Sequence, residues 1–224
     1  RYVFEERTVD KQRLLHALST DFADDAQLLA MLRYDAPKMG NDDDFVDDLA
    51  TQLLDWFAEA MEGYRNDRGG IFRAGTGSAM YYLWHADELG ASPDGRRSKE
   101  AFACNFSPSL FARTKGPVSL IKSFSKAHLE RVANGGPLTL ELHDTMFRSP
   151  ESIKKVASLV KTYMDLGGMQ MQLNGVNRET MLSAQKYPDQ YRNLIVRVWG
   201  WSGYFVELDK EYQDHIITRM ELDM

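Results

Sequence analysis

The sequence predicts an α/β fold in which helices precede alternating strands and helices. Apolar residues recur at helical spacing through the first third of the chain. From residue 138 onward, strand-like and helix-like segments alternate. Strands joined by helical crossovers form either a parallel sheet or a barrel, and the residue pattern alone leaves both architectures open.

Three helices are expected in the first third of the chain. Residues 9–19 and 23–34 have the spacing of short helices, and Pro37 follows the second. Residues 43–64 predict a long helix with one apolar stripe. The acidic run 42–44 precedes it. Because carboxylates in a first turn complement the helix dipole, we interpret this run as a helix start and not as a metal site.

The last third carries the clearest secondary-structure signals. Residues 138–143 alternate apolar and polar side chains, as a half-buried strand does. Ser149 and Pro150 supply an N-cap and a first-turn proline for a helix that ends at Gly167 and Gly168. The elements expected after it are a strand at 169–173, a helix from Asn177 to Lys186, a strand at 194–198 and a helix from about 209 to 219.

Composition excludes some classes of protein. The net charge of −6 leaves no basic footprint for nucleic acid, and no apolar run approaches the roughly 18 residues that span a bilayer. The single cysteine excludes an internal disulfide framework and fits a reducing, cytoplasmic compartment. Because the chain opens at Arg1 within ordinary globular sequence, we expect it to be a piece of a longer polypeptide.

Candidate sites other than the C-terminal loop are weak. The glycine-rich segment 75–78 lacks the lysine of a phosphate loop, and no histidine pair has metal-ligand spacing, so neither a nucleotide site nor a metal site is predicted. Gln170, Gln172 and Asn174 would share one strand face, where they could contact substrate or pair with one another. We keep Gln172 and Asn174 as candidate pocket residues.

The segment that follows the last expected strand is the most informative. Residues 197–203 read Arg-Val-Trp-Gly-Trp-Ser-Gly, and Gln213, Ile216 and Arg219 follow at fixed offsets. This spaced pattern resembles the signature of glycyl radical enzymes, with Gly200 at the position of the radical residue. The simpler interpretation is that Gly200 and Gly203 only shape a tight turn.

The chemistry explains why a glycine is needed at this position. Loss of a hydrogen atom from the α-carbon leaves a radical that is delocalised over the amide nitrogen and the carbonyl, provided that the centre can flatten. A side chain would oppose flattening and block the abstracting radical, whereas glycine has no Cβ. Storage of a radical on Gly200 is therefore the interpretation we favour.

Further segments resemble the same family in the expected order. They are the Gly-Asn-Asp segment at 40–42, the Pro-Asp-Gly-Arg segment at 93–96 and the Ser-Pro pair at 107–108. The resemblance implies the C-terminal part of a ten-stranded α/β barrel with a C-terminal glycyl radical loop and helix. It also implies that residues 1–99 belong to the pyruvate formate-lyase-like barrel domain and residues 100–224 to the glycine radical domain.

The resemblance assigns roles around Gly200. The residues expected to support the radical loop are Arg197, Trp199, Trp201, Gly203, Gln213, Ile216 and Arg219. Trp199 and Trp201 depart from the commoner family pattern, in which a small residue precedes the radical glycine and a tyrosine follows it. Both tryptophans could exclude water and oxygen, or they could simply pack.

The family also uses a cysteine that receives the radical and attacks substrate. Cys104 does not match it, because it lies in a segment that resembles a later part of the family and no acidic residue follows it closely. We interpret Cys104 as a structural thiol and expect the catalytic cysteine to lie upstream of Arg1. The chain alone would then not turn over substrate.

The resemblance implies an anaerobic mechanism with external activation. An iron–sulfur activating enzyme of the radical-SAM class uses S-adenosylmethionine to install the radical on Gly200, for which the loop must leave the barrel. No bound cofactor is implied, and the full enzyme is expected to be a homodimer in an anaerobic bacterium or archaeon. The Trp-Gly-Trp segment is nearest to the lyase, decarboxylase and arylsuccinate-synthase branches, which include C–S lyases and dehydratases; a formate acetyltransferase stays open.

Two other hypotheses remain. The chain could be a stand-alone glycyl radical subunit that replaces a damaged C-terminal region, although its length argues against this. It could also be an unrelated α/β binding domain with a coincidental loop.

Overall fold

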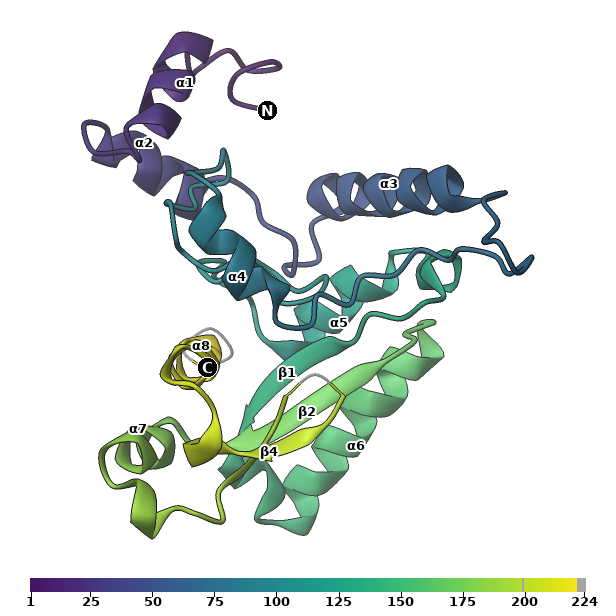
Figure 1. Ribbon diagram of the computed structural model, residues 1–224, viewed down its shortest axis with the longest axis vertical. Helices are drawn as coiled ribbons and strands as arrows, with labels where there is room; N and C mark the ends of the chain where they lie inside the picture. Colours follow the sequence, from purple (N-terminus) through teal and green to yellow (C-terminus); the bar gives the residue numbers. More distant parts are fainter. Residues whose placement is uncertain (199, 221–224) are drawn as a thin grey trace. The chain divides into compact units, whose positions relative to one another are not determined.

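The computed structural model describes residues 1–198 and 200–220, and its chain divides into two compact units (Figure 1). The first unit comprises residues 1–37 and 80–102, and the second comprises residues 38–79 and 103–224. The boundary expected between residues 99 and 100 separates two family domains, whereas the two units here are defined by compactness. The expected domain boundary therefore stays a prediction.

The first unit is helical. It contains α1 (Lys11–Ser19), α2 (Ala26–Ala30), which continues into a π-helical turn at Met31–Asp35, and α4 (Tyr81–Glu88). Its core residues include Phe22, Leu28 and Leu32. The Pro-Asp-Gly-Arg segment has a structural role here. The Arg96 guanidinium is buried, donates to the carbonyls of Arg97 and Glu100 at 2.9 Å each, and lies 4.1 Å from the Phe102 ring centre.

A parallel pair of strands organises the second unit. Strand β1 (Leu138–His143) pairs with β2 (Met171–Val176), and α6 (Pro150–Asp165) is the crossover between them. Registered residues of a parallel pair share a face. Leu138 and Leu140 of one face pack with Met171 and Leu173 against α6 and α5 (Pro117–Ser125). The opposite face carries Thr139, Glu141, Gln172 and Asn174 and is polar.

A hairpin follows. Strand β3 (Ile195–Arg197) pairs antiparallel with β4 (Ser202–Tyr204), so Arg197 faces Ser202 across the ends of the loop that contains Gly200. The hairpin packs with α7 (Arg178–Lys186), the turn Phe205–Glu207 and α8 (Lys210–Met220), which Figure 1 shows beside one another. Their shared core is Val176, Met181, Ala184, Val196, Val198, Phe205, Ile216 and Ile217.

Helix α3 (Asp44–Met61) begins at the acidic run, as predicted. Asp43 is its N-cap and accepts a hydrogen bond from the Phe45 amide at 3.1 Å. Lys126 follows α5 and contacts Asp42, Asp44 and the buried Asp47. Partial burial lowers the pKa of Lys126, but the hydrogen bonds that its ammonium donates to the three carboxylates outweigh this effect and raise the pKa well above its ordinary value. Local ion pairing therefore accounts for the acidic run.

The predicted alternation of strands and helices after residue 138 is confirmed. The α/β character is also confirmed, although the described residues form two two-stranded sheets, so the barrel itself is not seen in this chain. Among the α-helices and strands of the described ranges, α4, α5 and β4 were not predicted. Helix α4 lacks a regular apolar stripe, and β4 consists of Ser202, Gly203 and Tyr204, of which the first two favour turns. Within the described ranges, none of the helices combines the length and apolarity required to cross a bilayer.

The sheet core makes one testable prediction. Phe124 of α5 is fully buried among the leucines of β1, so Phe124→Ala should lower the free energy of unfolding by about 3–5 kcal/mol. Lys154→Ala on the exposed face of α6 is the control and should change it by less than about 0.5 kcal/mol. Urea denaturation followed by circular dichroism measures both; equal effects would contradict this account of the core.

Candidate functional site: a glycine loop on the polar face of a strand pair

The loop between β3 and β4 presents Gly200 at its tip. The Val198 amide donates to the Trp201 carbonyl at 2.8 Å and closes the loop. Gly200 is exposed and has φ +72°, in the left-handed region that favours glycine. A Cβ added to Gly200 would have nothing within 4 Å among the described residues. The backbone conformation, and not a lack of space, is what demands glycine here.

Asn174 binds the backbone of β3 at Arg197, where the strand leads into the loop. Its side-chain oxygen accepts from the Arg197 amide at 2.6 Å, and its side-chain nitrogen donates to the Arg197 carbonyl at 3.0 Å. Asn174 is only 3% exposed. One carboxamide thus satisfies both backbone groups of Arg197, in the way that a neighbouring strand would.

Gln172 holds the tip of the loop. It lies two residues before Asn174 on the same face of β2, and its side-chain oxygen accepts from the Gly200 amide at 3.0 Å. Gln170 instead accepts from the Gly136 amide at 2.9 Å. All three amides of this row therefore bind backbone groups of other segments. Contact of Gln172 or Asn174 with a substrate stays a prediction.

Helix α8 binds the segment that follows β4, on the C-terminal side of the loop. The Gln213 side chain donates to the carbonyls of Phe205 at 3.0 Å and Leu208 at 2.9 Å, which ties the helix to the turn after β4. Ile216 is buried in the core that Val196 and Val198 share. Gln213 and Ile216 thus lie where an anchor of the loop would have to lie.

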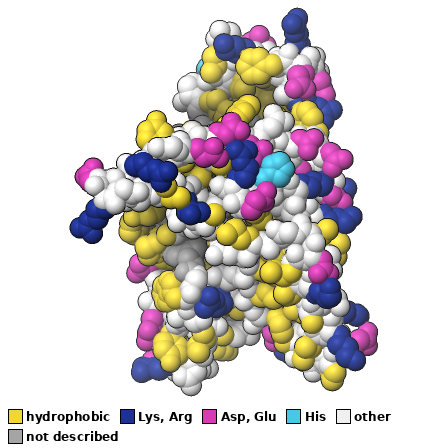
Figure 2. Space-filling model, turned by 90° about the vertical axis from the view of Figure 1, so that its right-hand side faces the viewer, with side chains coloured by type: hydrophobic (Ala, Val, Ile, Leu, Met, Phe, Trp, Pro, Cys, Tyr) yellow, Lys and Arg dark blue, Asp and Glu magenta, His cyan; other side chains and the backbone are white. Residues whose placement is uncertain are grey.

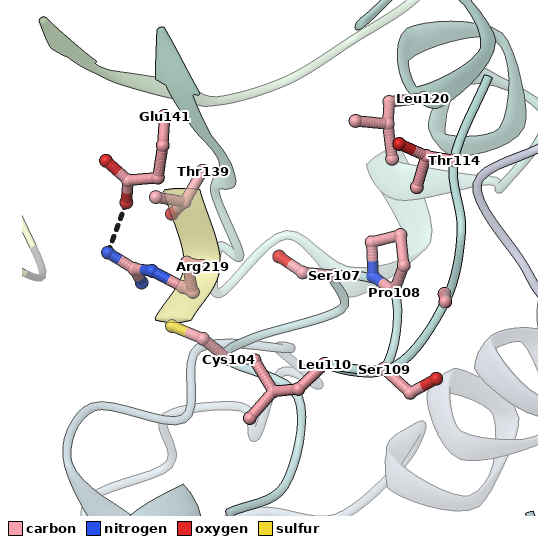
Figure 3. A pocket seen from close by; sticks show the side chains of 11 residues that line it. Cys104, Ser107, Pro108, Ser109, Leu110, Thr114, Leu120, Thr139, Glu141 and Arg219 are labelled. Carbon is pink, nitrogen blue, oxygen red and sulfur yellow. Dashed lines mark hydrogen bonds and ion pairs between the residues drawn. The ribbon is translucent and has the colours of Figure 1, made fainter. Parts of the chain in front are cut away.

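Arg219 joins α8 to β1. Its guanidinium pairs with Glu141, whose side chain is 1% exposed, and Figure 3 shows this pair at the wall of a cavity. Burial raises the pKa of Glu141, whereas the Arg219 charge and a hydrogen bond with Asn174 lower it; the net shift is upward. No local sequence pattern could assign Arg219 to Glu141 as a partner, because the two residues are 78 positions apart.

His215 is buried on α8 beside this pair. Burial, with a smaller contribution from the Arg219 charge, lowers the pKa of His215 to about 3. The imidazole is therefore neutral throughout the physiological range. No sequence signal marked His215, because one histidine on a helix is most often a packed core residue.

The residues beside Gly200 are less constrained. The Arg197 guanidinium donates to the Ser202 hydroxyl at 3.3 Å, and a Cβ on Gly203 would approach the Trp201 ring to 2.7 Å. Trp201 is 49% exposed. Trp199 lies outside the described residues. The roles of both tryptophans as walls stay predictions.

An open cavity of about 480 Å³ lies beside the loop tip. Gly200, Gln172 and Arg197 line it together with Asn105 and Gln170. Its polar groups are amides and a guanidinium, which can orient a partner by hydrogen bonds but are poor proton-transfer groups. The cavity therefore suits access to the Gly200 α-carbon better than acid–base chemistry.

Cys104 belongs to a different cavity. It is 2% exposed and lines a small hollow of about 40 Å³ with Ser107, Thr139, Glu141 and Arg219 (Figure 3). Among the described residues, the two cavities share no lining residue. This placement supports the interpretation of Cys104 as a structural thiol.

Comparisons with known proteins agree with this geometry. Residues 102–206 match the family model "Glycine radical", and residues 1–84 match the model "Pyruvate formate lyase-like". The chain is 35% identical to the probable dehydratase YbiW of Escherichia coli over 99% of this chain and 28% of that protein. It is 30% identical to trans-4-hydroxy-L-proline dehydratase of Clostridioides difficile over 98% of this chain and 28% of that protein.

Solved structures give the same result. The B12-independent glycerol dehydratase of Clostridium butyricum superposes with a TM-score of 0.94 at 34% identity, over 98% of this chain and 28% of that one. The loop and the β1–β2 pair that supports it lie within the segment that matches the glycine radical model. The chain belongs to the glycyl radical enzymes and matches the C-terminal portion of that family. It spans about 28% of the length of these relatives.

The left-handed conformation of Gly200 makes a prediction about stability. Gly200→Ala should fold and lose about 1–2 kcal/mol, because an L-residue is strained at this φ although its Cβ meets no neighbour. Gly203→Ala should instead displace the Trp201 ring and shift tryptophan fluorescence. Thermal unfolding followed by tryptophan fluorescence distinguishes the two variants. A loss of stability in Gly200→Ala well above about 2 kcal/mol would contradict the prediction, because it would require a steric contact that this geometry lacks.

The buried His215 makes a prediction about pH. Its folded pKa lies below its unfolded value of about 6.5, so its contribution is complete above pH 6.5 and is lost as pH falls toward about 3. Between pH 7 and pH 5, the protein should lose about 2 kcal/mol that the His215→Gln variant does not lose. Urea denaturation at both pH values measures this difference. His16→Gln on an exposed surface is the control and should keep the wild-type pH dependence.

Proposed function

We propose that this chain is the C-terminal part of an anaerobic enzyme that stores a radical on Gly200 and passes it to a catalytic cysteine outside this chain. The cysteine then drives radical cleavage or addition at a small organic substrate. The observation that carries the proposal is the placement of Gly200. A glycine in a left-handed conformation lies at the tip of a fastened loop, with its α-carbon open beside a polar cavity.

The support of the loop fits the demands of radical storage. A stored radical must stay in one place yet reach a reacting partner, so the loop needs firm ends and an accessible tip. Asn174, Gln213 and Ile216 fix the backbone on both sides of the loop, while Gly200 itself stays exposed. Arg197, Gly203, Trp201 and Arg219 are assigned to loop support, and Trp199 is assigned with them from the sequence alone.

The reaction assigned to the whole enzyme is a lyase reaction. Relatives include dehydratases, the isethionate sulfite-lyase of Nitratidesulfovibrio vulgaris and the indoleacetate decarboxylase of Tractidigestivibacter scatoligenes. We therefore favour dehydration, C–S cleavage or decarboxylation. The amides of Gln172 and Asn174 already bind backbone groups, so residues outside this chain would have to supply most of the substrate specificity.

The proposed partners follow from the same role. They are an iron–sulfur activating enzyme that uses S-adenosylmethionine, and the remainder of the enzyme, assembled as a homodimer in the cytoplasm. Exposed apolar side chains support the second partner, and Figure 2 shows such side chains among charged ones on one face. On α3, Leu53 and Trp56 are 61% and 60% exposed, which is a surface that further protein would cover.

The test is the radical itself. The complete enzyme that contains this chain, incubated without oxygen with an activating enzyme and S-adenosylmethionine, should show a glycyl doublet in its electron paramagnetic resonance spectrum. Gly200→Ala should abolish the doublet and reduce activity at least 1000-fold, while circular dichroism shows a folded protein. Gly90→Ala is the control and should keep the doublet, because a Cβ at Gly90 meets nothing within 4 Å and its φ is not in the left-handed region. Absence of the doublet from the wild-type enzyme would refute the proposal.

A further inference from the structure

The polar face of β2 presents side-chain amides at alternate positions. Two of them bind the radical loop, one at its start and one at its tip. Asn174 binds both backbone groups of Arg197, where the loop begins. Gln172 binds the amide of Gly200, at the tip. Both side chains are more than nine-tenths buried, at 3% and 6% exposure, and their hydrogen bonds to the loop are partly buried.

We propose that Gln172 and Asn174 are positioning residues that hold the loop at two points, and that the Gln172 hydrogen bond orients the Gly200 amide over which the radical is delocalised. This inference rests on the proposed function. It goes further by assigning two residues outside the loop to the placement and the electronic environment of the radical. We call the two side chains the amide clasp.

The root of the loop is held more firmly than its tip. Asn174 makes two hydrogen bonds to Arg197 and also contacts Glu141, which pairs with Arg219. A continuous chain of polar contacts thus runs from α8 through β1 and β2 to the loop root. At the tip, the hydrogen bond that the described residues provide to the Gly200 amide is the one to Gln172. Release of the tip would break that bond and leave the root in place.

The chemistry of the acceptor suits a radical neighbour. Spin on the Gly200 α-carbon is shared with the adjacent amide nitrogen. A hydrogen bond from that N–H to a carbonyl oxygen increases the electron density on nitrogen and fixes the plane of the amide. Because Gln172 is neutral and does not titrate, it provides this acceptor without a charge or a competing proton.

The first experiment needs no radical. In the complete enzyme before activation, hydrogen–deuterium exchange of the Gly200 amide should be at least tenfold faster in Gln172→Met than in the wild type. Gln170→Met is the matched control, because Gln170 has the same side chain on the same face but binds Gly136. It should leave exchange at Gly200 unchanged. Equal exchange in the wild type and in Gln172→Met would overturn the clasp.

The second experiment uses the activated enzyme. Electron–nuclear double resonance should show an exchangeable proton coupling from the Gly200 amide that changes in Gln172→Met and is retained in Gln172→Glu, where an acceptor oxygen remains. The radical should also decay several-fold faster in Gln172→Met, while Gln170→Met keeps the wild-type lifetime.

Identical couplings and lifetimes in the wild type and Gln172→Met would overturn the electronic part of the inference. If Gln172→Met does not fold, retention or loss of the coupling in Gln172→Glu decides the same point. A wild-type enzyme without any doublet would refute the proposed function alone, since amide exchange at Gly200 still tests the clasp.

Discussion

The pairing between the Asn174 carboxamide and the Arg197 backbone is the interaction on which the site depends. A short strand such as β3 leaves backbone groups that need partners, and burial makes unpaired groups costly. One side chain of β2 supplies both a donor and an acceptor to Arg197. It thereby brings the hairpin onto the polar face of the β1–β2 pair, and the position of Gly200 follows from that docking.

The two faces of the β1–β2 pair have different roles: one packs in the core, and the other binds the loop. The apolar face packs against α5 and α6 and supplies the stability of the unit. The polar face is buried as well, but it carries Glu141, Gln172 and Asn174, whose burial is tolerated only because each has partners. A site built on such a face inherits the rigidity of the sheet, which loop residues alone could not provide.

Local signals in the sequence were sufficient for the helices and strands after residue 138, with the exception of β4. Alternation gave the bounds of β1, and Ser149 and Asn177 were found as N-caps. The sequence motif also located Gly200. Contacts between distant residues could not be found in this way, because the pairing of Asn174 with Arg197 depends on how β3 docks on β2. The Glu141–Arg219 pair likewise required the packing of α8, which no local pattern encodes.

In the described part of the loop, the amides of Gln172 and Asn174 bind main-chain atoms. Such contacts ignore the identity of the side chains that the loop carries, provided that Gly200 keeps its conformation. The loop is in this sense interchangeable. Flanking residues can diverge, as the tryptophan at position 201 does from the commoner tyrosine, without redesign of the strand that supports them. Loop sequences from enzymes with different reactions could therefore be exchanged on one scaffold.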